Sequence, residues 1–207
     1  MTKWICMRSS LLPTNRQFVH SAMNASAPYF LGGRYMERIS IQEPLASPKL
    51  RQLRDYWLEA CGDRRMPSRR DIDPISIPHL LPNITLIDVV RDPLRFRYRL
   101  IGTAITELTG RDATGRWLDS KLYGENLDEM LWTFQTCTEN REPVAVRQKA
   151  QFPDRDWLLV EVLLVPMGTS DEAVDVIMSG LVAVDEDVKQ PSQDIGYILD
   201  WRLDAAS

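Results

Sequence analysis

The pattern of apolar and polar positions predicts an amphipathic helix at the start of the folded body. Between residues 48 and 61, apolar side chains recur every three or four positions, as they do along one face of a helix. Ser47 supplies a side-chain oxygen that can cap the first free amide groups, and Pro48 is tolerated at the first helical position. Gly62 ends the pattern, and Arg54 is expected on the polar face.

From residue 84 onward the apolar positions alternate, which is the period of a β-strand. Residues 84–89 form the first alternating stretch, and residues 91–94 carry a turn signal. In residues 95–100 arginines alternate with apolar side chains, with Tyr98 and Leu100 on the same buried face. Two strands joined so closely predict an antiparallel hairpin with one buried and one solvated face.

Two helices and three more strands are expected next. A short helix runs from Thr103, its expected cap, to Gly110, and a longer helix spans residues 125–140. The strands are expected at residues 144–150, 157–165 and 174–184. The last two are apolar on nearly both faces, which places them inside the sheet and leaves the arginine-rich strand near an edge.

This order predicts an α+β fold with a five-stranded, mostly antiparallel sheet, helices on one face and an amphipathic helix before it. We expect residues 1–46 to be a basic, disordered extension, residues 47–187 the domain, and residues 188–207 a tail or a short closing helix. An organellar transit peptide, or a true start at a later methionine, are the alternatives for the extension.

Charge limits the partners that the chain can have. The 207 residues carry a net charge of −4, and residues 1–40 hold five basic side chains against one acid. The acidic remainder argues against binding nucleic acid, since duplex affinity depends on neutralising phosphates. No apolar run reaches the roughly 18 residues of a membrane helix. Three cysteines without a C-x-x-C pair favour neither a disulfide framework nor a structural zinc site.

Several local motifs accompany this order of elements. They are Met66-Pro67, Asp71 to Pro74, Ile77-Pro78, Leu80 to Pro82, Ile87 to Val89, Phe96 to Thr103 and Gly110 to Arg116. With them the chain resembles the Per-Arnt-Sim (PAS) family over residues 48–186, and is similar to short, stand-alone bacterial PAS proteins known best from alphaproteobacteria. The resemblance implies a cytoplasmic sensory or signalling module that commonly dimerises through the helix before the sheet.

A ligand pocket and a dimer interface are the candidate sites. The inner face of the sheet and the helix 125–140 would enclose an apolar cavity for a small molecule. Its predicted lining is Tyr98, Leu100, Ile105, Leu108, Leu131, Phe134, Val146, Trp157 and Met178. For the helix 48–61, the apolar stripe of Leu50, Leu53 and Trp57 could pair with a second copy; the alternative is that it folds back on its own sheet.

Cofactor and anion chemistry find little support in the sequence. The segment from Gly110 to Gly115 lacks the lysine of a phosphate-binding loop, although Arg111 and Arg116 could contact a small anion. PAS-like light sensors use a cysteine in an Asn-Cys-Arg motif, which is absent here. Residues 125–140 contain no histidine for a haem iron. We therefore expect no cofactor and no metal.

Catalysis is not expected either. Asp88 and Glu161 are the only acids inside strongly apolar strands, and we interpret Glu161 as part of a solvent-facing side. The preferred function is a sensory or signalling module, not an enzyme, that binds a small ligand or a partner protein and relays through protein–protein contacts. The alternatives are a non-sensing structural adaptor and an enzyme with Asp88 or Glu161 as its base.

Overall fold

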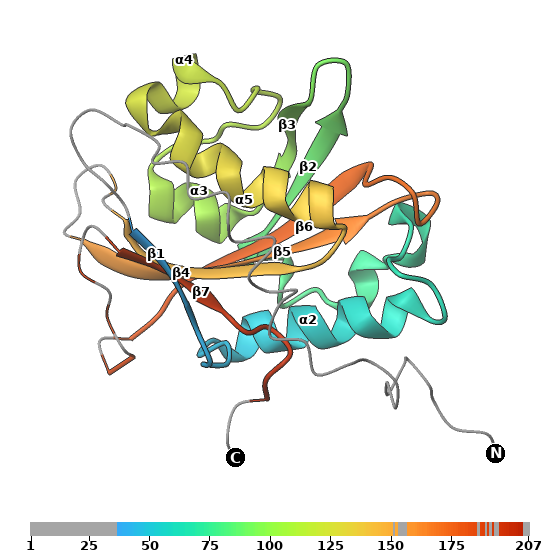
Figure 1. The fold of residues 1–207 in the computed structure, drawn as a ribbon, viewed down its shortest axis with the longest axis horizontal. Coiled ribbons are helices and arrows are strands. Elements are labelled where there is room, and N and C mark those ends of the chain that lie inside the picture. Colours follow the sequence, from blue (N-terminus) through green and yellow to red (C-terminus); the bar gives the residue numbers. More distant parts are fainter. Residues whose placement is uncertain are drawn as a thin grey trace.

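Seven strands form one sheet in the computed structural model, which describes residues 37–150, 152, 157–185, 187–188, 190, 192 and 195–204. In order across the sheet, the strands are β1 (Glu37–Ile41), β7 (Ile195–Leu199), β4 (Val144–Ala150), β5 (Leu158–Met167), β6 (Val176–Ala183), β2 (Ile84–Val90) and β3 (Arg95–Ile101). Neighbouring strands run antiparallel, except that β1 is parallel to β7. The α+β class and the mostly antiparallel sheet are confirmed (Figure 1).

All five strands expected from the sequence form, and two more extend the sheet to seven. The strands β5 and β6 lie inside the sheet and β3 lies at an edge, as predicted. The helix expected near the C-terminus is wrong for residues 195–199, which form β7 and pair with β4. This stretch is rich in isoleucine and tyrosine, which fit a pleated sheet, and it is too short for periodicity to separate helix from strand.

The strand β1 falls in the segment that was expected to be a disordered extension. Its residues pair with β7, from Glu37 opposite Ile195 to Ile41 opposite Leu199. The sheet therefore reaches beyond both boundaries of the predicted 47–187 domain. Residues 1–36 lie outside the described residues.

Three helices begin and end close to the predicted positions, and a fourth, short helix at residues 120–123 lies in a stretch for which the sequence predicts no helix. They are α2 (Pro48–Cys61), α3 (Thr103–Thr109), α4 (Ser120–Tyr123) and α5 (Leu127–Asn140), with short 3-10 turns η1 (Arg69–Asp71), η2 (Pro74–Ser76), η3 (Leu81–Asn83) and η4 (Gly124–Asn126). The Ser47 hydroxyl accepts from the Leu50 amide at the start of α2, which confirms the predicted cap. In the described part of the chain, no helix is long and apolar enough to cross a membrane.

The cap of α3 differs from the prediction. Gly102, rather than Thr103, is the capping residue, and no side chain caps this helix. A Cβ atom at Gly102 would collide with the carbonyl oxygen of Pro82. The glycine therefore allows the β3–α3 junction to approach the backbone of η3 closely.

The helices cover both faces of the sheet (Figure 1). The helices α3, α4 and α5 lie on one face, which we call the inner face, and α2 crosses the other, the outer face. Leu50 and Leu53 of α2 press against Gly180 of β6, where an added Cβ atom would lie 2.6 and 2.7 Å from their methyl carbons. On the inner face, the ring centroids of Phe96 and Phe134 lie 5.5 Å apart. The sheet is thus the middle layer of three.

Candidate functional site

The layer between the inner face and α3–α5 is where the sequence predicts a ligand. Six of the nine predicted lining residues come from the elements that bound this layer. These are Tyr98 and Val146 from the strands, Ile105 and Leu108 from α3, and Leu131 and Phe134 from α5. All six are buried or half-buried, and Tyr98, Val146 and Phe134 belong to one hydrophobic core cluster against which Leu131 packs, while a ligand pocket lined by the six stays a prediction.

Three of the nine predicted residues do not belong to this group. Leu100 and Met178 both pair with Leu86, on the outer face of the sheet. The register of β2 and β3 shifts between Leu86 and Ile87, and this bulge moves Leu100 away from the face of Tyr98. Leu100 is 46% exposed as a result, and Trp157, before β5, is 38% exposed. For Leu100 and Met178 the pocket prediction is wrong, and for Trp157 it stays a prediction.

Two tyrosine hydroxyls meet at one side of the layer. The Tyr98 hydroxyl from β3 and the Tyr123 hydroxyl from α4 share a short hydrogen bond. Burial raises the pKa of Tyr98 well above its usual value, and the neighbouring Tyr123 adds to the rise. Burial also raises the pKa of Tyr123, against the lowering effects of its hydrogen bond to Tyr98 and of Arg111. Both hydroxyls are therefore neutral at physiological pH and form a polar pair in an apolar layer.

The two arginines of the predicted anion contact have different surroundings. Arg111 stands 5.0 Å from the centre of the Tyr123 ring and donates to the Leu122 carbonyl at 3.0 Å. Arg116 is exposed, and its backbone carbonyl accepts from the Tyr98 amide along the edge of β3. Arg111 thus supports the tyrosine pair, and an anion site formed by both arginines stays a prediction.

A buried ion pair that the sequence analysis missed connects β4 with β5. Glu161 is 0% exposed, so its interpretation as a solvent-facing residue is wrong. Arg147, opposite it in register, is 2% exposed and donates from Nε and Nη2 to Glu161 Oε1 at 3.0 and 2.8 Å. Arg147 also donates to the Glu43 carboxylate at 2.9 Å. The available signal was a single acid within the apolar strand β5 and the basic residues Arg147 and Lys149 in β4, but which residues pair depends on the register.

Glu161 also holds the start of α2. Its two carboxylate oxygens accept from the backbone amides of Ala46 and Ser47, at 3.0 and 2.9 Å. A carboxylate suits this position because the first amides of a helix have no partner within the helix and carry partial positive charge. The central strand β5 is therefore bonded directly to the N-terminal end of the helix on the outer face.

The C-terminal segment is bonded to the same helix. Arg54, expected on the polar face of α2, is instead 5% exposed. Its guanidinium donates to the carbonyls of Trp201 and Leu203, at 3.2 and 3.0 Å, and contacts the Asp204 carboxylate at 3.1 Å. The rings of Trp57 and Trp201 meet edge to face. The residues that follow β7 thus cover α2. The sequence predicts instead that this side of the helix, which carries Arg54, faces solvent.

The predicted dimer stripe is covered within the chain. Leu50, Leu53 and Trp57 are 1%, 1% and 3% exposed, and the Trp57 indole donates to the Pro166 carbonyl at 2.8 Å. The alternative considered from the sequence, that the stripe folds back on its own sheet, describes the structure. With α2 in this position, the prediction that the stripe forms a dimer interface is therefore wrong.

Asp88, the other candidate base, lies between arginines of the edge strand. It is 8% exposed, and Arg97 contacts its Oδ2 at 3.0 Å while Arg99 contacts Oδ1. Arg95 stacks on the Trp117 ring, with 3.9 Å between the guanidinium carbon and the ring centre. Neither Asp88 nor the fully buried Glu161 is placed as an accessible base.

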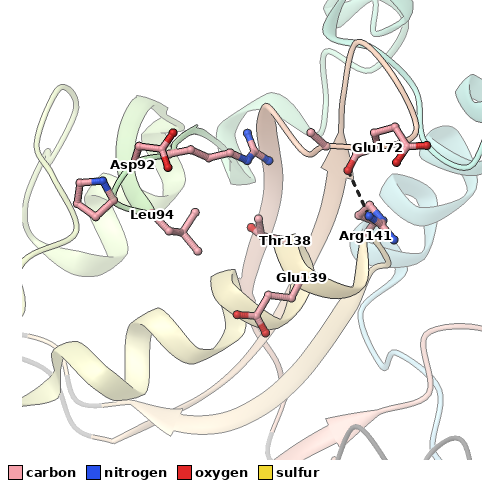
Figure 2. A pocket seen from close by; sticks show the side chains of 9 residues that line it. Asp92, Leu94, Thr138, Glu139, Arg141 and Glu172 are labelled. Carbon is pink, nitrogen blue, oxygen red and sulfur yellow. Dashed lines mark hydrogen bonds between the residues drawn. The ribbon is translucent and has the colours of Figure 1, made fainter.

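A separate open depression of about 400 Å³ lies where the β2–β3 turn meets the end of α5 and the β5–β6 loop. Figure 2 shows Asp92 and Leu94 on one side and Thr138 and Glu139 on the other. Its lining residues are Arg91, Asp92, Pro93, Leu94, Thr138, Glu139, Arg141, Glu172 and Ala173. Arg91 donates to the Val174 carbonyl and Arg141 to that of Glu172, so both arginines brace the walls.

The family of the chain follows from its sequence match. A family model described as the PAS domain matches residues 45–182, more than half of the chain. The chain belongs to the PAS domain family. This match spans α2, the helices of the inner face and the strands from β2 to β6, and it confirms the resemblance inferred from the local motifs. No curated protein sequence matches this PAS domain.

Several solved structures are similar to this PAS domain. A LOV protein of Rhodobacter sphaeroides is 12% identical over 56% of this chain and 71% of its own, with a TM-score of 0.41. The PAS domain of BvgS from Bordetella pertussis is 18% identical over 65% of this chain and 88% of its own, with a TM-score of 0.40. A sensory box sensor histidine kinase from Vibrio cholerae is 12% identical over 54% and 91%, with a TM-score of 0.37.

Among the residues that the structure describes, no three or more histidine, cysteine, aspartate or glutamate side chains gather as metal ligands. Cys137 is buried on α5, and burial raises the pKa of its thiol, which keeps it protonated.

Proposed function

We propose that this PAS domain is a sensory or signalling module that binds a small ligand and relays the event through protein–protein contacts. Membership of the family supports a sensory rather than a catalytic role. The acidic body supports a protein partner over nucleic acid, and we propose a cytoplasmic location without a cofactor.

The observation that carries this proposal is the double role of β5. Val162 faces the inner layer opposite Val146, and its neighbour Glu161 faces outward and bonds the amides at the start of α2. A ligand that displaced the strand from the inner side would move this carboxylate relative to Ala46 and Ser47. Since the hydrogen bonds are direct, the shift would reach α2 without an intermediate element.

The proposed ligand lies in the inner layer. Tyr98, Ile105, Leu131, Phe134 and Val146 are its proposed apolar contacts. The Tyr98–Tyr123 hydroxyl pair is the proposed polar contact, because each neutral hydroxyl can donate as well as accept. We infer a small, largely apolar molecule with one or two polar groups.

Thermal unfolding across a metabolite panel tests the proposal, because a ligand that binds only the folded state raises Tm. The expected result is a concentration-dependent rise for one chemical class. Leu131→Phe, which adds bulk to the inner layer, should abolish that rise. Leu58→Phe, on α2 at the other face, should keep it. A rise that survives Leu131→Phe unchanged would place the ligand elsewhere.

A structural adaptor is the second candidate, and one contact favours it. The rings of Phe96 and Phe134 already meet within the inner layer, so the domain's own side chains occupy part of that space. An adaptor would hold its partners at constant affinity and give no rise in Tm across the panel. Recovery of the same partners with and without added metabolites would then support it.

A further inference from the structure

The outer face of β3 carries a basic surface that neither the sheet core nor the inner layer uses. Arg95, Arg97 and Arg99 are exposed at alternate positions, and Trp117 lies beside Arg97 across the strand edge. We call these four residues the arginine face. It belongs to the β2–β3 hairpin, which projects away from α2 (Figure 1). The helix α2 makes its main contacts with the sheet at β5 and β6.

The guanidinium groups of the arginine face are held in place before any partner arrives. Those of Arg95 and Arg97 stand 3.9 and 5.6 Å from the centre of the Trp117 ring. Arg97 and Arg99 both contact the carboxylate of Asp88, which is 8% exposed. A partner would therefore meet arginines whose conformational freedom is already reduced, which lowers the entropic cost of binding.

The charge of this face contrasts with that of the chain. Three arginines against one aspartate leave it positive, whereas the whole chain carries a net charge of −4. Two exposed apolar side chains lie beside the arginines, Leu100 at 46% and Val90 at 38%. This combination of fixed guanidinium groups, an aromatic ring and exposed apolar contacts is characteristic of protein interfaces.

We propose that the arginine face docks an extended acidic segment of a partner protein. Alternate residues of a regular strand lie about 6.6–6.8 Å apart, so a segment with carboxylates at alternate positions matches the spacing of Arg95 and Arg97, and Arg99, at the bulge of β3, adds a third positive charge beside them. Guanidinium groups bind carboxylates through paired hydrogen bonds. The segment lies over the face, since the backbone of residues 115–118 already pairs with the edge of β3 at Phe96 and Tyr98. This inference rests on the proposed relay through protein contacts and names its surface.

Fluorescence anisotropy with a labelled peptide of four Thr-Glu repeats tests the inference on the full chain. The wild-type protein should bind this peptide at low salt and not its Thr-Gln counterpart, with affinity falling as salt rises. Arg95→Gln should weaken binding about two- to five-fold, the range of one exposed charge pair. Arg70→Gln is the matched control, because Arg70 is exposed outside the arginine face, and it should bind as the wild type does.

A second variant tests the role of Asp88. Asp88→Asn keeps the size of the side chain but frees Arg97 and Arg99 from their carboxylate, so binding should tighten by a similar factor. Circular dichroism establishes that each variant is folded. If Asp88→Asn does not fold, the comparison of Arg95→Gln with Arg70→Gln decides alone.

Four results would overturn the inference. The first is equal binding of the Glu and Gln peptides, and the second is an equal loss of affinity in Arg95→Gln and Arg70→Gln. The third is tighter binding of an oligothymidylate than of the peptide. The fourth is the absence of peptide binding together with salt-sensitive self-association that is lost in Arg95→Gln. The third would identify nucleic acid as the occupant and the fourth a second copy. If the peptide does not bind as expected but the ligand-dependent rise in Tm is still observed, the arginine face is rejected as a docking surface and the proposed sensory function is not.

Discussion

Arg147 and Glu161 face each other across β4 and β5, with 2.8 Å between Arg147 Nη2 and Glu161 Oε1, and both are almost completely buried. The pair satisfies its own charges and also bonds the segment before α2 through Glu43 and the Ser47 amide. It joins the sheet to the N-terminal end of α2, whereas Leu50, Leu53 and Trp57 pack the rest of the helix on the outer face.

Breaking this pair from one side should be strongly destabilising. In Glu161→Gln the buried guanidinium of Arg147 loses its main counter-charge, and the amides of Ala46 and Ser47 lose a charged acceptor. We expect the free energy of unfolding, measured with urea, to fall by about 3–5 kcal/mol. Glu142→Gln, which removes a half-buried acid that contacts Arg202 and Arg65 at the surface, should cost less than about 1 kcal/mol. Equal losses in the two variants would contradict this account of the buried pair.

Removing Arg54 should release the C-terminal segment from α2. Arg54→Ala loses the bonds to the carbonyls of Trp201 and Leu203, and we expect a loss of roughly 1–3 kcal/mol in unfolding free energy. Hydrogen exchange should accelerate in residues 195–204. Arg51→Ala is the matched control on the same helix, because Arg51 binds the Leu45 and Ala46 carbonyls and should affect the start of α2 instead. If hydrogen exchange in residues 195–204 accelerated in both variants, Arg54 would not specifically hold the C-terminal segment on α2.

Two glycine substitutions should differ in cost for a geometric reason. A methyl group at Gly180 meets the side-chain ends of Leu50 and Leu53, which can shift, so Gly180→Ala should cost about 1–3 kcal/mol. At Gly102 the obstacle is the backbone of Pro82, which cannot rotate away. Gly102→Ala should therefore be the more damaging variant in thermal unfolding. The reverse order would mean that the contact between η3 and α3 is looser than described.

The tyrosine pair predicts how stability changes at alkaline pH. Burial raises the pKa of Tyr98 in the folded state above its unfolded value. The corresponding stability is fully present below the unfolded pKa and is lost as the pH rises through the folded value. Stability should therefore fall as the pH rises above about 10, the ordinary tyrosine pKa, and fall less steeply in Tyr98→Phe. Identical pH profiles for the two proteins, from urea titrations, would show that the hydroxyl does not titrate in this way.

Local signals predicted the elements of this fold well. The cap at Ser47, the hairpin of β2 and β3 and the helix α5 depend on residues close together in sequence, whose preferences operate without the rest of the chain. The assignment to the PAS family came from motifs of the same local kind.

The errors share a dependence on distant partners. Glu161 is buried beneath the start of α2, opposite Arg147 in register, and no property of the β5 sequence alone states that register. Arg54 is buried by residues 147 or more positions away. Leu100 left the predicted pocket because of one bulge, which changes the face of every residue beyond it. The sequence therefore predicted several of the residues of the candidate site, but it did not predict which face of the sheet or which partner each residue would have.

Native mass spectrometry of the full chain, purified from its own host without denaturation, tests the central claim most directly. The sensory account predicts a retained small molecule in the wild-type protein, and its loss from Leu131→Phe while Leu58→Phe keeps it. Repeated spectra of the bare polypeptide mass in every preparation would contradict the account and favour the adaptor.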